Sequence, residues 1–397
     1  MVVWIENPFD NLPLEGFRAQ RYWLMSAAFA SLGHRVVYWT SDFSHSRKRK
    51  RCLQDDFFGF GFELKFVETV PYRKNVSFAR IRSHRLYAAK WKSLCIDYAK
   101  SNPPPDVVIV SSPPLATGDV ALFLKRTFSC KVVADMMDAW PQTFERLFPK
   151  YLGFLGKVFF TSFYKMQKRL LLSADLVTGV SARYAHLAKV LGVRSFHLAY
   201  HAIELSGSSL PQREHGGRTR IVYAGSLGRT YDLKTVIKAV STLENCELSI
   251  AGDGESLPML KRLVSDLNCG DKVFFTGYLP DKELKSLFEV SDIGVIPMSE
   301  ESFVGMPYKI ADYSASSLAI ASSLKGESAQ LLSEYGAGIL YRYGDAADCA
   351  RAIVELSNDI FEKKLSSARM ARECFDSSLV YAGYVEKVQR IVSLDRR

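Results

Sequence analysis

The chain has 397 residues, of which 48% are hydrophobic, and its formal net charge is +10 at pH 7. This length predicts two domains, and the apolar content is sufficient for two cores. No run of about 18 uncharged apolar residues is present, which excludes a membrane-spanning helix. The first residues, 1–8, lack the basic start and cleavage site of a signal peptide. The seven cysteines are scattered without a CxxC pair, which favours reduced thiols in a cytoplasm over a metal site.

The positive charge is concentrated in two segments. Residues 47–51 are five consecutive basic residues, and a second basic segment runs over 80–92. An excess of positive charge predicts an anionic partner, for which nucleic acid, an acidic membrane and a phosphorylated small molecule all qualify. Such runs are most often solvated loop faces, and contact with a membrane or a nucleic acid is the alternative.

Strands and helices alternate through the first half of the chain. A helix through Tyr22 and Leu32 is expected to end at Gly33. Apolar strands are expected at 2–5, 35–39, 64–67, 107–110, 132–134 and 176–180. Because these strands are apolar throughout instead of alternating, we expect a parallel sheet that helices cover on both faces.

The alternation stops at residues 205–219, which are rich in Gly, Ser and Pro, and restarts with a strand at 221–223. A helix follows with apolar residues at i, i+3, i+4 and i+7, namely Leu233, Val236, Ile237 and Val240. Further strands are expected at 248–250, 273–275, 293–296 and 318–321.

We therefore predict an α/β protein of two doubly wound domains, 1–204 and 220–375, joined by a linker at 205–219. A C-terminal helix in 376–397 is expected to return to the first domain. Ligands are expected at the carboxyl ends of the strands, in a cleft between the domains.

Three glycine-containing turns follow strands of the second domain. They read AGSLG at 224–228, AGDGE at 251–255 and TGYLP at 276–280. Glycines such as Gly225 and Gly228 let backbone amides approach a phosphate, and Arg229 adds a bidentate cation. The spacing is neither GxGxxG nor a Walker loop, and ordinary tight turns are the alternative. Tyr278 is a candidate to stack on a nucleobase, with simple packing as its alternative.

The segment 305–313, GMPYKIADY, predicts a loop followed by a helix start. Lys309 and Asp312 are three residues apart, which places them on one helix face. The loop amides and the helix N-terminus favour phosphate, the lysine neutralises it, and the carboxylate accepts from ribose hydroxyls. An ordinary helix start with a surface ion pair is the alternative.

These four segments, with LGHRV at 32–36 and ADLVTGVS at 174–181, resemble the GT-B glycosyltransferases of the large retaining family 4 in their order and spacing. The resemblance runs over about the whole chain. It implies that Arg229 and Lys309 hold the donor diphosphate and that the amides of Gly305 and Met306 meet the donor sugar and phosphate.

The resemblance also implies that Asp312 stands in the place of a ribose-binding glutamate. The second glutamate of the family lies eight positions earlier, where this chain has Val304. Glu300 and Glu301 lie slightly upstream, and neither is assigned to the donor sugar.

Residues 135–141 resemble an Asp-x-x-Asp-x-Trp-Pro segment of family members that build surface polysaccharides. The resemblance places Asp138 at the cleft, and a capping role before Pro141 is the alternative. No third ligand accompanies Asp135 and Asp138, so no metal site is expected. Gly16, in the loop after the first strand, is expected to approach the donor or the acceptor closely.

Aromatic residues alternate with lysines over 147–172. This composition is typical of a membrane interface, and core packing of a long helix explains it equally well.

Together these features predict a metal-independent retaining glycosyltransferase with catalytic residues Asp138, Arg229 and Lys309 and no cofactor. It would transfer a hexosyl or N-acetylhexosaminyl group from a UDP- or GDP-linked donor to a glycan or polyprenyl-linked acceptor in lipopolysaccharide or capsule synthesis. We expect it in the cytoplasm, peripheral on the anionic inner face of the plasma membrane.

Two alternatives belong to other functional classes. A non-hydrolysing nucleotide-sugar epimerase would need carboxylates poised for anti-elimination, which the sequence does not reveal. A nucleic-acid-binding protein is disfavoured because the basic run belongs to no recognisable binding module.

Overall fold

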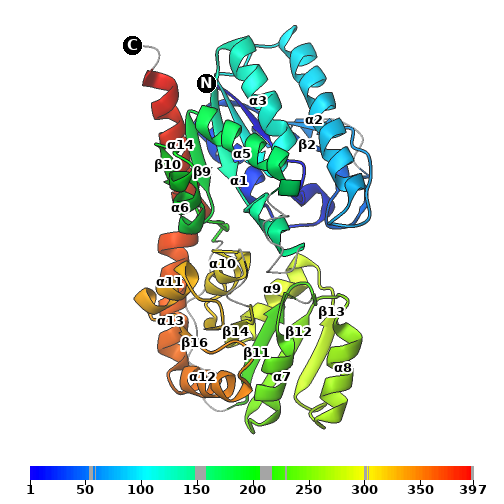
Figure 1. The fold of residues 1–397 in the computed structure, drawn as a ribbon. Helices are drawn as coiled ribbons and strands as arrows, with labels where there is room; N and C mark the ends of the chain where they lie inside the picture. The colour runs from blue at the N-terminus through cyan, green and yellow to red at the C-terminus, as the bar shows by residue number, and fades with distance from the viewer. Residues whose placement is uncertain are drawn as a thin grey trace. The chain divides into compact units, whose positions relative to one another are not determined.

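The protein is described by a computed structural model that covers residues 1–52, 57, 58, 60–147, 158–205, 217–228, 230–298, 302 and 304–394. The chain forms two compact units (Figure 1). Unit 1 comprises residues 1–200 and 378–397, and unit 2 comprises residues 201–377. Most of the segment expected to be a linker, 206–216, lies outside the described residues.

Unit 1 is built on an eight-stranded sheet in the order β10-β9-β8-β7-β1-β2-β6-β5. All neighbouring pairs are parallel except β5 with β6. The strands are β1 (Val2–Glu6), β2 (Arg35–Ser41), β5 (Phe57–Phe58), β6 (Glu63–Val67), β7 (Val107–Ser112), β8 (Lys131–Met136), β9 (Leu176–Gly179) and β10 (Phe196–Leu198). Every residue of β7 is buried, as expected for a central strand covered on both faces.

The crossover segments of unit 1 are helical. They are the 3-10 helices η1 (Pro13–Glu15) and η2 (Gln142–Leu147) and the α-helices α1 (Arg21–Ser31), α2 (Phe78–Ala99), α3 (Leu115–Phe128), α5 (Thr161–Ser173) and α6 (Ala182–Val190). A small antiparallel hairpin, β3 (Phe43–Ser44) with β4 (Arg49–Lys50), follows β2. Within the described ranges, no helix is both long and apolar enough to cross a bilayer.

A buried ion pair of unit 1 lies beside the C-terminal helix α14 (Ser377–Ser393), whose Tyr381 and Tyr384 rings are 5.9 and 5.8 Å from the Arg21 guanidinium carbon. Arg21 donates through Nε and Nη2 to both carboxylate oxygens of Asp135, at 2.7 and 2.9 Å. Tyr22 and Thr178 also donate to Asp135, and Tyr384 of α14 lies 3.2 Å from the Thr178 hydroxyl. Burial alone would raise the pKa of Asp135, but the Arg21 guanidinium and these hydrogen bonds hold it below its usual value. Asp135 therefore has a structural role.

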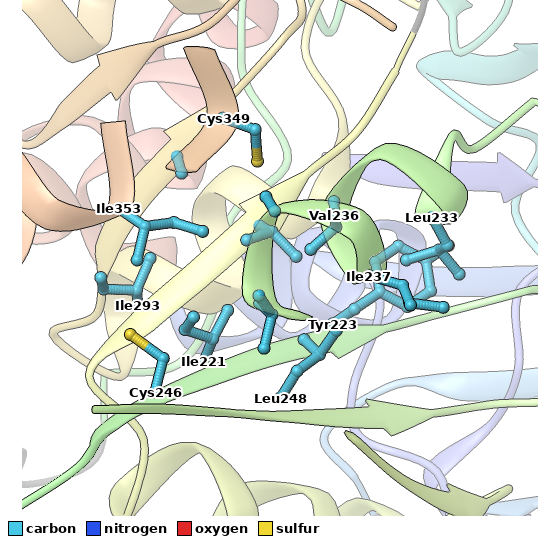
Figure 2. Close-up of a cluster of buried hydrophobic side chains, with 14 of the residues drawn as sticks. Ile221, Tyr223, Leu233, Val236, Ile237, Cys246, Leu248, Ile293, Cys349 and Ile353 are labelled. Carbon is cyan, nitrogen blue, oxygen red and sulfur yellow. The ribbon is translucent and has the colours of Figure 1, made fainter. Parts of the chain in front are cut away.

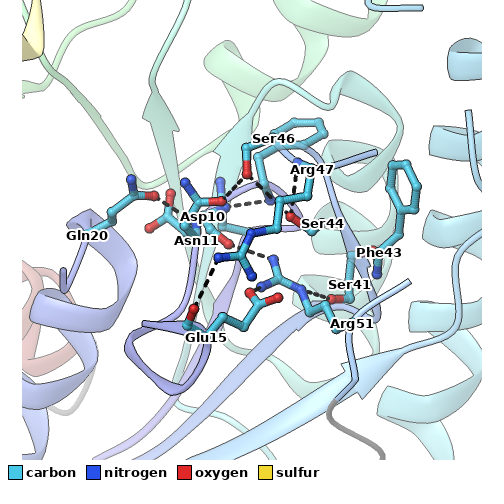
Figure 3. Close-up of polar contacts among 12 residues, drawn as sticks. Asp10, Asn11, Glu15, Gln20, Ser41, Phe43, Ser44, Ser46, Arg47 and Arg51 are labelled. Atoms are coloured by element: carbon cyan, nitrogen blue, oxygen red, sulfur yellow. Dashed lines mark hydrogen bonds and ion pairs between the residues drawn. The ribbon is translucent and has the colours of Figure 1, made fainter. Parts of the chain in front are cut away.

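The basic run 47–51 is only partly a solvated face. Arg51 is buried, donates to the carbonyls of Ser41 at 2.9 Å and Asp10 at 2.7 Å, and forms an ion pair with Glu15 (Figure 3). Arg47 is exposed, with its guanidinium 4.3 Å from the centre of the Phe17 ring. Arg51 thus fixes the loop that follows β1, whereas Arg47 lies at the surface.

Unit 2 contains a six-stranded, wholly parallel sheet in the order β13-β12-β11-β14-β15-β16. The strands are β11 (Thr219–Ala224), β12 (Cys246–Ala251), β13 (Val273–Gly277), β14 (Ile293–Ile296), β15 (Ala319–Ser322) and β16 (Gly338–Leu340). The helices are α7 (Leu233–Ser241), α8 (Leu257–Asp266), α9 (Asp281–Glu289), α10 (Tyr308–Ala315), α11 (Glu327–Tyr335), α12 (Ala346–Asn358) and α13 (Ile360–Met370), followed by a π-helical turn, η4 (Ala371–Phe375). The direction of winding reverses between β11 and β14, where sheets of this type bind ligands.

The predicted apolar stripe of α7 is confirmed as the core contact of unit 2. Its members, Leu233, Val236, Ile237 and Val240, are at most 1% exposed and pack on the sheet (Figure 2). Ile221 of β11 and Ile293 of β14 lie beneath them, and Ile353 of α12 extends the same core. The period of the sequence therefore fixed which face of α7 is buried.

Candidate functional site

The three glycine turns of unit 2 meet at the carboxyl ends of neighbouring strands. The Gly225 amide donates to the Ala251 carbonyl at 2.9 Å, and the Gly252 amide donates to the Gly277 carbonyl at 2.7 Å. The Leu227 amide reaches the carbonyl of Asp253 at 2.9 Å. Turns that are about 25 residues apart in sequence are thus packed against one another by backbone hydrogen bonds.

Two glycines of the AGDGE turn are required because the backbone of the AGSLG turn lies too close for a side chain. A Cβ at Gly252 would lie 1.9 Å from the Gly225 carbonyl oxygen, and a Cβ at Gly254 would lie 2.7 Å from the backbone of Leu227. Gly225 and Gly252 also have φ values of 145° and 138°, which other residues rarely adopt. The glycines therefore build a dense backbone edge next to the β11–β14 switch point.

Lys309 brings a cation to this edge. Its Nζ lies so near the first turn that a Cβ at Gly225 would be 2.4 Å away. The same Nζ lies 4.4 Å from the ring centre of Tyr231 and 5.1 Å from that of Tyr223. The structure thus brings Lys309 and Gly225 into contact, as a phosphate-binding role for both requires.

Tyr313 fixes the helix that carries Lys309, and the sequence analysis did not identify this role. Its buried hydroxyl accepts from the Ala224 amide at 3.1 Å and donates to the Val295 carbonyl at 3.4 Å. A Cβ at Gly294 would lie 2.4 Å from the Tyr313 ring, so the strand must present a glycine there. The signal in the sequence was a glycine in β14 paired with an aromatic residue one helical turn after Lys309.

The remaining donor-site candidates are distributed along the same unit. Gly305 and Met306 precede α10, with Met306 only 3% exposed, and Asp312 lies one turn after Lys309 and is half-buried. Tyr278 follows β13 and is 63% exposed. These four assignments to the donor remain predictions.

The assignments of Gly228 and Arg229 to the donor also remain predictions. A Cβ at Gly228 would meet no atom within 4 Å, so the described structure gives no steric reason for a glycine there. Arg229, Glu300 and Glu301 lie outside the described residues.

Asp138 of unit 1 caps the turn that follows β8. Its Oδ1 accepts from the Ala139 amide at 2.8 Å, and its carbonyl accepts from the Trp140 amide at 2.9 Å. Burial raises the pKa of Asp138, while the Ala139 amide and the charge of Arg80 oppose that shift. The geometry shows the capping role that the sequence left open, and the catalytic role remains a prediction.

Gly16 ends the short helix η1. Its φ is 80°, its amide donates to the Pro13 carbonyl, and a Cβ there would meet no atom within 4 Å. The glycine is explained by this left-handed backbone conformation. Its close approach to a donor or acceptor remains a prediction.

The aromatic–lysine stretch divides into two parts, apart from residues 148–157, which lie outside the described residues. Phe160 is buried with Trp140 and Phe144, which supports the core-packing interpretation for that position. Val158 and Phe159 are 67% and 63% exposed, as a membrane interface would require. Within the described ranges, no three His, Cys, Asp or Glu side chains gather into a possible metal site.

Comparison with known proteins places these observations in a family context. Residues 218–359, which fall within unit 2, match the family described as Glycosyl transferases group 1. Over 182 residues the chain is 25% identical to the amylovoran biosynthesis glycosyltransferase AmsK of Erwinia amylovora. That alignment covers 43% of this chain and 45% of AmsK, so the chain spans about half the length of the curated relative it matches.

Solved structures match over nearly the whole chain. Sucrose-phosphate synthase from Thermosynechococcus elongatus has a TM-score of 0.75 at 13% identity and covers 99% of both chains. Anabaena Alr3699/HepE, solved in complex with UDP, has a TM-score of 0.67 at 11% identity over 98% of this chain and 99% of its own. The chain has the GT-B fold of two Rossmann-like domains, and the predicted fold class is confirmed.

Proposed function

We propose that the protein is a glycosyltransferase that takes a sugar from a nucleoside-diphosphate sugar bound to unit 2. The observation that carries this proposal is the contact of the Lys309 amine with the Gly225 turn at the β11–β14 switch point. A cation above a packed backbone turn suits a diphosphate. The family match over residues 218–359 supports the proposal because it falls on this unit, and it favours transfer over epimerisation.

The donor we propose is UDP- or GDP-linked. UDP is the first to test because Alr3699/HepE has been solved with UDP and with UDP-glucose. On this proposal Asp312 accepts from ribose hydroxyls, and the side chain of Tyr278 stacks on the base. The transferred group is a hexosyl or N-acetylhexosaminyl group.

The chemistry we propose depends on stabilising the departing diphosphate. Negative charge grows on that group as its bond to the anomeric carbon breaks, and the Lys309 ammonium lies where this charge develops. Arg229 adds a second positive charge, and Asp138 of unit 1 is the third catalytic residue that we propose. The acceptor hydroxyl attacks from the face that the diphosphate leaves, which retains the anomeric configuration, and no metal or cofactor takes part.

The acceptor we propose is a glycan or polyprenyl-linked sugar of surface-polysaccharide synthesis, such as lipopolysaccharide or capsule. AmsK supports this class because its name assigns it to amylovoran biosynthesis. We also propose that the protein acts at the cytoplasmic face of the plasma membrane. The exposed Val158 and Phe159, with exposed Lys165 and Lys168 on the helix that follows, support such a contact.

The direct test of the function is a donor screen that scores release of the nucleoside diphosphate in the presence of EDTA. Lys309→Ala should lower turnover by ~10²-fold, as loss of a transition-state donor does. Lys238→Ala is the matched control, since Lys238 is an exposed helical lysine of the same unit. Equal turnover of folded Lys309→Ala and wild type would remove Lys309 from the site, and loss of activity in EDTA with rescue by magnesium would refute the metal-free mechanism.

A further inference from the structure

A group of basic and aromatic side chains at the carboxyl edge of the unit 1 sheet has no role in the account above. We call it the basic–aromatic cluster. Phe9 follows β1, Tyr72 follows β6, and Trp140 follows β8. The basic members are His45 and Lys48, from the hairpin after β2, and Arg80 and His84, from the first two turns of α2. Five separate chain segments therefore contribute to one edge of the sheet.

Arg80 is the centre of this cluster. Its guanidinium carbon lies 4.7 Å from the Trp140 ring centre, 5.5 Å from that of Phe9 and 5.8 Å from that of Tyr72. It donates through Nη1 to the Asn75 carbonyl at 2.8 Å and through Nε to the His84 ring at 3.3 Å. In the part of the chain that the structure describes, no carboxylate lies within 4 Å of this guanidinium.

The other basic side chains crowd around Arg80 in the same way. Lys48 Nζ lies 3.3 Å from His45 Nδ1 and 5.0 Å from the Tyr72 ring centre. Burial lowers the pKa of His45 and of His84 to about 3 and that of Lys48 to about 8, and the positive charge of Arg80 adds to all three shifts. Burial is the larger cause of each shift, and repulsion between the neighbouring basic groups is the smaller one.

A buried or half-buried cation without an ion-pair partner is costly unless a ligand supplies the opposite charge. Asp138 acts on Arg80 from a greater distance, and its own pKa is raised by burial. One weakly favoured carboxylate does not balance Arg80 and Lys48 together. The imbalance would be removed by an oxyanion, which the planar guanidinium of Arg80 can bind with two hydrogen bonds and which Lys48 can neutralise.

We propose that the basic–aromatic cluster binds an oxyanion carried by the acceptor, either a phosphate or the carboxylate of an acidic sugar. The inference rests on the proposed function, since it names the chemistry of the acceptor for that transfer. Arg80 holds the oxyanion within its aromatic surround, Lys48 supplies the second positive charge, and His45 and His84 line the site as neutral imidazoles. The acceptor is thereby selected by its charge.

The test is calorimetric titration of the full chain with inorganic phosphate, with D-glucuronate and with neutral glucose. We expect an oxyanion to bind and glucose not to bind, and the tighter of the two oxyanions identifies the source of the charge. Arg80→Gln should weaken that binding by about tenfold or more, because a charge-assisted hydrogen bond is lost. Arg82→Gln is the matched control, since Arg82 is an exposed residue on the same helix.

Further variants separate this site from the donor site and from a folding defect. Lys309→Ala should leave the Arg80-dependent part of the oxyanion binding unchanged, and Arg80→Lys should retain the fold and part of the affinity while losing the bidentate geometry. In transfer assays, Arg80→Gln should raise the KM for an anionic acceptor and leave kcat and donor affinity unchanged.

Three results would overturn the proposal. They are an absence of oxyanion binding in the wild type, wild-type affinity in folded Arg80→Gln, and binding that is lost in Lys309→Ala but kept in Arg80→Gln. If no nucleotide sugar is turned over while oxyanion binding still depends on Arg80, the proposed transfer fails and the oxyanion site itself stands.

Discussion

Unit 1 and unit 2 are each built on a doubly wound, mainly parallel sheet, but the carboxyl edges of the two sheets are made of different groups. In unit 2 the edge is made of backbone, with three turns packed together by glycines and the amine of Lys309 beside the first turn. In unit 1 the edge is made of side chains, with aromatic rings around Arg80. Backbone amides suit a group that every donor shares, such as a diphosphate, whereas side chains suit a group that differs between acceptors.

The largest effect is expected when a side chain is introduced into the carboxyl edge of the unit 2 sheet, which is made of backbone. In Gly252→Ala the added methyl would lie 1.9 Å from the Gly225 carbonyl oxygen, at a φ of 138°. We expect a loss of about 3 kcal/mol or more in the free energy of unfolding, from the clash and the backbone strain together. Chemical denaturation measures it, with Gly270→Ala as control because a Cβ there meets no atom within 4 Å. Equal losses in the two variants would contradict the packing described for unit 2.

A second change separates the role of the first turn in binding from its role in folding. Gly225→Ala directs a methyl group at the Lys309 amine, whereas Gly228→Ala enters open space without a left-handed φ. We expect Gly225→Ala to lower turnover by ~10²-fold, because displacing a catalytic cation by about 1 Å has an effect of that size. Steady-state kinetics on the two folded variants would decide the matter. If Gly228→Ala is the more impaired variant, Lys309 does not act from the position seen here.

The edge of unit 1 predicts a pH dependence that unit 2 does not share. Glu6, at the end of β1, is buried, and burial raises its pKa to about 8, so the folded protein keeps a proton that the unfolded chain releases above about pH 4.5. The contribution of Glu6 to stability should therefore fall as the pH rises from about 4.5 to 8, by up to about 1.4 kcal/mol per pH unit. His45 and His84, whose pKa values are lowered, contribute with the opposite sign below about pH 6.5. Asp10 has the same sign, but burial raises its pKa only to about 6.

Glu6→Gln should remove most of this slope between pH 6.5 and 8, above the range in which Asp10 titrates. Urea unfolding at several pH values measures the slope for both proteins, followed by a signal from unit 1. An identical slope in wild type and Glu6→Gln would show that Glu6 is ionised in the fold across that range.

The sequence predicted the scaffold better than the sites. The interior strands of both sheets were predicted because apolar runs of this kind must be buried on both faces. They are β1, β2, β6, β7, β8 and β9 in unit 1 and β11, β12, β14 and β15 in unit 2. The strands β10 and β16 were missed, since each is only three residues long and has exposed and half-buried positions. Helix α2 was interpreted only as a basic segment, because its buried residues are interspersed with arginines.

The sites were harder to predict because they depend on contacts between distant residues. The contact of Lys309 with Gly225 followed from the order of strands in a doubly wound sheet, so a motif-based prediction could reach it. The sequence placed Arg51 in a solvated run, but the structure buries it in an ion pair with Glu15. Glu15 lies 36 positions away, so local spacing could not reveal this pair. The basic–aromatic cluster joins residues from Phe9 to Trp140, and nothing in local spacing indicates that they meet.

The central claim is that unit 2 holds a nucleoside diphosphate against Lys309, and direct titration with UDP and GDP tests it without requiring the acceptor to be known. The account predicts binding of one of them to the wild type and to Lys238→Ala with equal affinity. In Lys309→Ala the affinity should fall by about tenfold or more, because a charge-assisted contact to phosphate is lost. Unchanged affinity in folded Lys309→Ala, or binding of neither nucleotide to the wild type, would contradict it.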